Sequence, residues 1–220
     1  MEFLTLPTAA FAAETLPYSA SGLSLPAHYA VCFSVLLLFL CEALFAADIR
    51  GSCTYAVFCR VRSLGVTNGV FLFGKCVIPF FCRALLLCGL GFAAARAGLL
   101  TLTVGAMLSG FAGLLLLNLF LCALSAAASA TQLGAAIPCA MGGVCLFLCG
   151  GLLPLHLLPL RVATIGAYTP FGAACGLFAP LLGGNFSPQA SATAVLYAAA
   201  AVLLAVRRLD RLVRNGGLTV

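Results

Sequence analysis

The chain alternates long apolar runs with short polar segments, and the lengths of these runs predict membrane-spanning helices. A helix needs about 20 mostly apolar residues to cross about 30 Å of hydrocarbon. Five runs bounded by charged residues, proline or glycine approach or exceed this length: 29–47, 77–95, 99–124, 133–151 and 188–206. The last begins at Pro188, which fits a first helical turn because its missing N–H has no intrahelical partner there.

A sixth apolar stretch, 162–182, is also long enough to span, but Pro170 and Pro180 interrupt it. Basic residues near span ends are retained in the cytoplasm and therefore set orientation. With five spans and the N-terminus outside, Arg96 and Arg161 lie outside and Arg83 lies within a span. The remaining basic residues lie inside: Arg50, Arg60, Arg62, Lys75, Arg207, Arg208, Arg211 and Arg214. A sixth crossing would invert the basic tail, so we expect 152–182 to form two short helices that re-enter from outside.

The sequence predicts three parts: an external N-terminal tail at 1–28, a transmembrane domain at 29–214 and a cytoplasmic tail at 215–220. The external tail has no Lys or Arg to oppose its export, although it carries Glu2 and Glu14. Prolines interrupt every run that could serve as a secretory signal. We expect that a span preceding this tail is missing from the chain.

Composition narrows the class of protein. Hydrophobic residues make up 64% of the 220 residues and charged residues 7%, which excludes a soluble enzyme and a disordered chain. The net charge of +6 does not indicate nucleic-acid binding, because the basic residues are separated by apolar runs. An all-α integral membrane protein remains.

The twelve cysteines do not predict a disulfide framework or a metal site. Most lie within the predicted spans, where they behave as small apolar residues. Cys53, Cys59 and Cys76 fall on the predicted cytoplasmic side, where thiols stay reduced. The chain has no CxxC motif, and both histidines, His28 and His156, are expected on the opposite side.

Enzyme chemistry has little support. The segment from Gly69 to Lys75 fits the GxxxxGK part of a phosphate-binding loop, but Cys76 cannot supply the hydroxyl that holds magnesium. We expect an interfacial turn there, with Lys75 anchoring the next span at the headgroups. Serine catalysis needs a nearby base, and neither histidine lies within a span. The sequence predicts no enzyme and no cofactor.

Three polar residues within the predicted spans are candidates for a functional role. Glu42 is either interfacial or a contact for an ion or substrate, because burying a charge in a membrane is costly. We favour snorkelling of Arg83 toward the cytoplasmic interface over the alternative, an ion pair with Glu42. Asn118 is expected to hydrogen-bond between helices. Small residues four apart, such as Ser125 and Ser129, indicate close helix packing.

The polar segment between the first two runs predicts an amphipathic cytoplasmic helix. Ser52 can cap its start, and Gly65 can end it by adopting positive φ. An apolar row follows helical spacing beside two arginines: Val57, Val61 and Leu64, with Arg60 and Arg62 off the row. Such a helix either rests on anionic lipid or docks a cytoplasmic partner.

Two groups of motifs, in order, resemble the permease subunits of ABC-2-type transporters. The first group is Asp48, Gly51-Ser52, the run from Arg60 to Gly65, and Gly74-Lys75; in the family an acidic residue, a Gly/Ser start and a coupling helix precede a Gly-Lys. The second group is Gly150, Gly151, Pro154, Pro159 and the Tyr168-Thr169-Pro170 step; in the family this pattern leads into re-entrant outer helices. The resemblance extends from residue 29 to the C-terminus.

The resemblance implies a pore-forming subunit without its own nucleotide site. It would pair with a second permease subunit, identical or different, and take energy from a separate ATPase that docks on the coupling helix. The substrate would be apolar or amphipathic and move outward across a bacterial inner membrane. Family permeases usually have six spans, so the resemblance leads us to expect that the first span and any outer domain are missing here. The competing class is a non-transporting helical membrane protein, such as an assembly or immunity factor, or an inactive permease fragment; a membrane enzyme ranks third.

Overall fold

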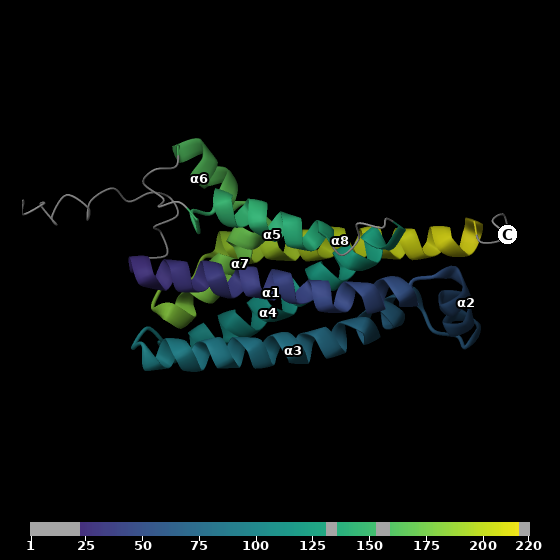
Figure 1. Ribbon diagram of the computed structural model, residues 1–220, viewed down its shortest axis with the longest axis horizontal. Helices are drawn as coiled ribbons and strands as arrows, with labels where there is room; N and C mark the ends of the chain where they lie inside the picture. Colours follow the sequence, from purple (N-terminus) through teal and green to yellow (C-terminus); the bar gives the residue numbers. More distant parts are fainter. Residues whose placement is uncertain (1–22, 131–135, 153–158, 216–220) are drawn as a thin grey trace, which may run out of the picture.

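A computed structural model describes residues 23–130, 136–152 and 159–215, and within these ranges every regular element is a helix (Figure 1). The α-helices are α1 (Leu25–Ser52), α2 (Tyr55–Ser63), α3 (Asn68–Arg96), α4 (Val104–Ala127), α5 (Ala136–Leu148), α6 (Leu160–Ala167), α7 (Pro170–Phe178) and α8 (Pro188–Asn215). Two short 3₁₀ helices, η3 (Ala128–Ala130) and η5 (Ala179–Leu182), follow α4 and α7. The described part of the chain is therefore all-α, as predicted.

Four helices are long and apolar enough to cross a membrane: α1, α3, α4 and α8. The pair formed by α6 and α7–η5 meets the same test only as a bent unit, with an angle of 73° at the break. Helix α5 is apolar but has 13 residues, and the start of the predicted span 133–151 lies outside the described residues. These long apolar helices fit a multi-pass membrane protein with four or five spans.

The boundary between the first two runs differs from the prediction. Helix α1 continues to Ser52, so Gly51 and Ser52 end a helix instead of starting one. Helix α3 already begins at Asn68, with the Thr67 side chain accepting a hydrogen bond from Val70 N at 3.4 Å. The expected interfacial turn at Lys75 is therefore wrong, and the whole GxxxxGK segment is helical.

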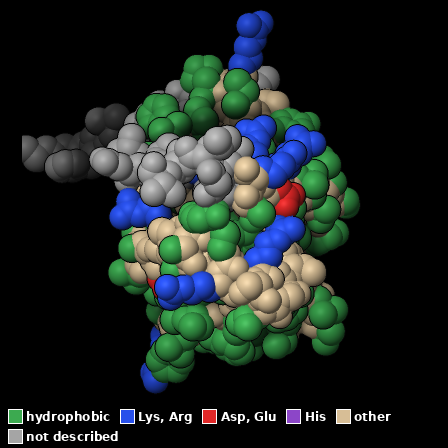
Figure 2. Space-filling model, turned by 90° about the vertical axis from the view of Figure 1, so that its right-hand side faces the viewer, with side chains coloured by type: hydrophobic (Ala, Val, Ile, Leu, Met, Phe, Trp, Pro, Cys, Tyr) green, Lys and Arg blue, Asp and Glu red, His purple; other side chains and the backbone are tan. Residues whose placement is uncertain are grey.

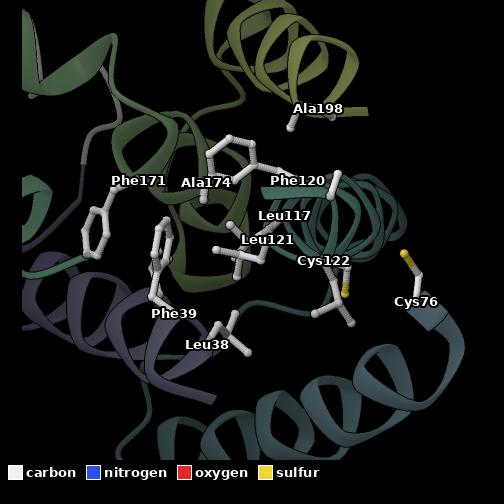
Figure 3. Packing of buried hydrophobic residues seen from close by; sticks show 14 of the residues in the cluster. Leu38, Phe39, Cys76, Leu117, Phe120, Leu121, Cys122, Phe171, Ala174 and Ala198 are labelled. Atoms are coloured by element: carbon white, nitrogen blue, oxygen red, sulfur yellow. The ribbon is translucent and has the colours of Figure 1, made fainter. Parts of the chain in front are cut away.

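Helix α4 occupies the centre of the bundle and packs against α1, α3, α7 and α8. Its buried Leu117 and Leu121 meet Phe39 of α1 and Phe171 of α7 in one apolar core (Figure 3). The Phe39 and Phe171 ring centroids are 5.6 Å apart. Burial of each such side chain contributes about 1.5–3 kcal/mol, so the core fixes α7 against the long helices.

The bundle has two distinct ends. We call the end that holds α2 and the last turns of α8 the α2 end, and the opposite end, which holds α6 and the start of α1, the α6 end (Figure 1). The loop before α4 also lies at the α6 end, where Thr101 N donates to Leu181 O at 2.8 Å. Helix α8 starts there too, because Ala190 packs against Gly176 of α7.

Candidate functional site

A buried polar cluster joins α1, α3 and α4 inside the bundle. Its members are Glu42, Arg83, Asn118 and Ser125, none more than 4% exposed. The Arg83 guanidinium donates to a Glu42 carboxylate oxygen and to the Asn118 side-chain oxygen. It also donates to Leu38 O at 3.4 Å. Two charges therefore lie wholly within the apolar part of the protein.

The cluster members Ser125 and Asn118 make further hydrogen bonds. Ser125 Oγ donates to Glu42 Oε1 at 2.5 Å, and Asn118 Nδ2 donates to the Cys76 carbonyl at 3.1 Å. Arg83 Nη1 also donates to Cys122 Sγ at 3.7 Å. Because the carboxylate and the guanidinium are both paired and hydrogen-bonded, their burial cost is offset, and the cluster holds three helices in one register.

This geometry changes two of the expectations for intramembrane residues. Snorkelling of Arg83 is wrong, because its side chain is fully buried and forms the alternative ion pair with Glu42. Glu42 is buried in α1 and is not interfacial. Asn118 does hydrogen-bond between helices, as expected. Ser125 was predicted only as a packing residue, and its hydrogen bond to Glu42 was not anticipated.

At the α2 end, helix α2 occupies the segment for which the sequence predicts an amphipathic helix. Gly65 follows it with φ of +79°, as predicted. The apolar row is different, however: Phe58 is the buried residue, with its ring centroid 5.1 Å from that of Phe71. Val57 is 42% exposed and Leu64 is 81% exposed. Val61 is half-buried against the core, so the three predicted residues do not share one free face.

Charged side chains fasten α2 and its neighbours at this end. Lys75 Nζ lies 3.0 Å from Asp48 Oδ2, which joins α3 to the end of α1. Arg62 donates to Asn68 Oδ1 at 3.1 Å, and Asn68 donates to Asp210 Oδ1 at 2.6 Å. These contacts connect α2, α3 and α8 outside the apolar core.

The α2 end carries a strong positive charge. Figure 2 looks onto this end and shows Lys and Arg side chains on several sides of it. Arg60 and the α8 residues Arg207, Arg211 and Arg214 form no ion pair within the described residues, while Asp48 and Asp210 each pair with a basic residue. The surface available to a partner at this end is therefore basic, and its exposed apolar groups include Val57 and Leu64.

The motif predicted for re-entrant helices lies at the α6 end. Gly150 ends α5 with φ of +72°, and Pro159 and Pro170 stand at the starts of α6 and α7. Pro154 lies outside the described residues. Thr169, which precedes Pro170, accepts a hydrogen bond from Gly172 N at 3.0 Å and so caps α7.

Three glycines allow close packing at this end, two of them against backbone atoms, and we call Gly151, Gly166 and Gly172 the glycine junction. A Cβ at Gly166 would overlap the Leu148 carbonyl oxygen, and one at Gly172 would overlap the Gly166 oxygen. A Cβ at Gly151 would overlap the Leu146 side chain. Gly151 belongs to the predicted motif, whereas Gly166 and Gly172 were not singled out from the sequence.

The cysteines do not form metal sites in the described part of the chain. All twelve are free thiols, and the described residues contain no group of three His, Cys, Asp or Glu side chains that could hold a metal ion. Burial raises the pKa of the Cys53 thiol, between α1 and α2, to about 11. That thiol stays protonated at neutral pH and is a poor nucleophile.

No protein-family model, curated protein or solved structure matches this chain. The fold and the buried cluster therefore define only a class: an all-helical protein whose long apolar helices fit several membrane crossings.

Proposed function

We propose that the chain is the membrane-spanning permease subunit of an ABC exporter. It moves an apolar or amphipathic substrate outward with energy from ATP hydrolysed by a separate subunit. The observation that carries the proposal is the arrangement of two special segments at opposite ends of one bundle. The short amphipathic helix α2 stands at the basic end, and the bent α6–α7 pair stands at the other.

The basic α2 end is the cytoplasmic end in this proposal. Arg50, Arg60, Arg62, Lys75 and four α8 arginines belong to that end, whereas Arg96 and Arg161 belong to the α6 end. Retention of basic residues in the cytoplasm favours this orientation. It gives α1, α3, α4, α5 and α8 as five crossings, with an external start and a cytoplasmic finish.

The α6–α7 pair is re-entrant in this scheme. The chain leaves α5 beside Cys32 of α1 and enters α8 beside Gly176, and both contacts lie at the α6 end. A segment that begins and finishes at one end of a bundle does not cross it. Irregular backbone at membrane depth must be buried against protein, and the glycine junction and the Thr169 cap meet that requirement.

A separate ATPase binds α2, and a second permease subunit completes the pore. Exposed Val57 and Leu64 provide apolar contact area for the ATPase, and Arg60 provides charge at its rim. On α1, the exposed row Phe33, Leu37, Leu40 and Leu44 gives a membrane-facing surface on which the second subunit can pack. The cytoplasmic docking element and the re-entrant pair together favour a permease over an assembly factor.

The test is site-specific photo-cross-linking in the cells that make this protein. A photoreactive residue replaces Val57 or Leu64 in the full chain, and Leu196, which is 70% exposed on α8, is the membrane-facing control. The proposal expects an adduct with a Walker-motif ATPase from α2 and none from position 196. Adducts from position 57 or 64 that contain only lipid would overturn it in favour of a helix resting on the membrane surface.

A Val61→Asp substitution would be a poor test of docking, because Val61 also packs against the core. Leu64→Asp is sharper, since an exposed substitution changes stability by about 0.5 kcal/mol or less. We expect Leu64→Asp to abolish copurification of the ATPase while membrane insertion and the melting temperature stay unchanged. If the Leu64→Asp chain copurifies the ATPase as well as the parent chain does, Leu64 is not part of the docking surface.

A further inference from the structure

A cavity of about 190 Å³ lies at the α6 end between α1, the α6–α7 pair and the start of α8. It is far larger than the roughly 10–15 Å³ that one water molecule needs. Polar groups line part of its wall, including His28, Tyr168, Cys175 and Gln189. A small polar molecule therefore has room beside the Cys175 thiol.

Two thiols and an imidazole meet at the wall of this cavity. Cys175 of α7 hydrogen-bonds with Cys32 of α1, which is fully buried behind it. Cys32 Sγ lies 3.6 Å from Nε2 of His28, one helical turn earlier. The His28 ring also hydrogen-bonds with the backbone of Cys149 and Gly150, which fixes its orientation.

A second pair of thiols provides a built-in comparison. Cys76 of α3 and Cys122 of α4 also hydrogen-bond with each other. Their neighbours are the polar cluster and an apolar groove, and the only histidine in the described residues is His28. This pair has the same sulfur contact without the imidazole or the polar cavity.

We propose that Cys32 and Cys175 are a redox-active dithiol that hydrogen peroxide converts to a disulfide joining α1 to α7. The contact between the thiols, the adjacent His28 and the cavity beside Cys175 carry this inference. The chemistry does not depend on which way the protein faces. Exposure of the cavity to an oxidising compartment rests on the orientation in the proposed function.

The reaction has two steps. His28 takes the Cys32 proton, and the Cys32 thiolate takes the proton of Cys175. The Cys175 thiolate attacks peroxide: the S–O bond forms, the O–O bond breaks, and the departing hydroxide takes the proton from His28 and leaves as water.

In the second step, the Cys32 thiol attacks the Cys175 sulfenic acid. The S–S bond forms, the S–O bond breaks, and the departing hydroxide takes the Cys32 proton to leave as a second water. Two thiols lose two electrons and two protons in total, and one peroxide becomes two waters. The product tethers the bent α6–α7 pair to α1.

The test treats the reduced, purified full chain with hydrogen peroxide and maps the resulting disulfides by peptide mass spectrometry. We expect the Cys32–Cys175 linkage to form at least about tenfold faster than the Cys76–Cys122 linkage, because an adjacent base speeds thiol reactions. Equal rates for the two pairs, or no Cys32–Cys175 linkage, would overturn the proposal.

Three variants separate the chemistry from packing. Cys175→Ser should abolish the linkage, and Cys145→Ser, a buried cysteine on α5, should leave its rate unchanged. His28→Gln should slow it by about tenfold or more while the melting temperature shows that the chain is folded. If the His28→Gln chain is folded and forms the linkage at the parent rate, His28 does not accept the proton and the proposed route is overturned.

Trapping of thiols in intact cells tests the orientation separately. A small, charged methanethiosulfonate reagent, which cannot cross the membrane, should modify Cys175 from outside intact cells and block later formation of the linkage if the cavity faces outward, with a Cys175→Ser chain as the control. Linkage in the purified chain, with Cys175 modified only after the cells are permeabilised, would contradict the orientation and leave the dithiol chemistry supported. Absence of linkage in the purified chain would contradict the dithiol alone.

Discussion

The polar cluster and the glycine junction hold helices together by opposite means. In the polar cluster, long side chains from α1, α3 and α4 fill the space between helices and pair their charges there. In the glycine junction, missing side chains let the backbones of α5, α6 and α7 come into direct contact. The first region depends on chemical complementarity, whereas the second depends on volume. A substitution that keeps the size of a residue should therefore damage only the first.

The largest effect is expected when one charge of the polar cluster is removed. Arg83→Met keeps much of the side-chain length but leaves Glu42 buried without its cation. We expect the free energy of unfolding to fall by about 3–5 kcal/mol, measured by denaturing titration in detergent micelles. The double variant Glu42→Gln with Arg83→Met should recover much of this loss. A loss below about 1 kcal/mol in the single variant would contradict the role assigned to the pair.

An intermediate effect is expected when one methyl group is added at the glycine junction. Gly166→Ala places a Cβ against the Leu148 carbonyl, so α5 and α6 must separate. We expect a loss of about 1–3 kcal/mol in the same titration. Gly143→Ala on α5 is the matched control, because its Cβ meets nothing within 4 Å. That control should be neutral or stabilising by up to about 1 kcal/mol. Similar losses of stability in both variants would contradict the claim that the glycine junction depends on the absence of side-chain volume.

The smallest effect is expected at the α2 end. Lys75→Met removes the ion pair with Asp48, whose side chain is 69% exposed. Water and salt screen such a pair, so we expect a loss of about 0.2–1 kcal/mol that decreases as salt is added. Unfolding titrations at low and high salt measure this dependence. A loss as large as that of Arg83→Met would show that burial is not what distinguishes the two ion pairs.

The sequence predicted the long helices well because hydrophobic length is a local property. The break before Pro170 and the positive φ of Gly65 were also predicted from single residues. The start of α3 was missed because Gly74 and Lys75 suggested a boundary, whereas the helix begins seven residues before Lys75, after the Thr67 side chain that caps it.

The candidate sites depended more on tertiary packing. Glu42 and Arg83 are 41 residues apart, so their pairing depends on how α1 and α3 pack, which no sequence period specifies. The same holds for Gly166, whose neighbour lies on α5. In contrast, the four-residue spacing of His28 and Cys32 was visible in the sequence and could have indicated their contact.

The length of α8 has a mechanical consequence. Its 28 residues extend about 42 Å at 1.5 Å per residue, so part of the helix projects beyond a hydrocarbon layer of about 30 Å. Asp210 lies on the projecting part and is bonded through Asn68 to Arg62 of α2. In the proposed function, a displacement of α2 would pull on α8 through these hydrogen bonds. Helix α8 would then carry the displacement to the opposite end of the bundle, where its first turn touches α7.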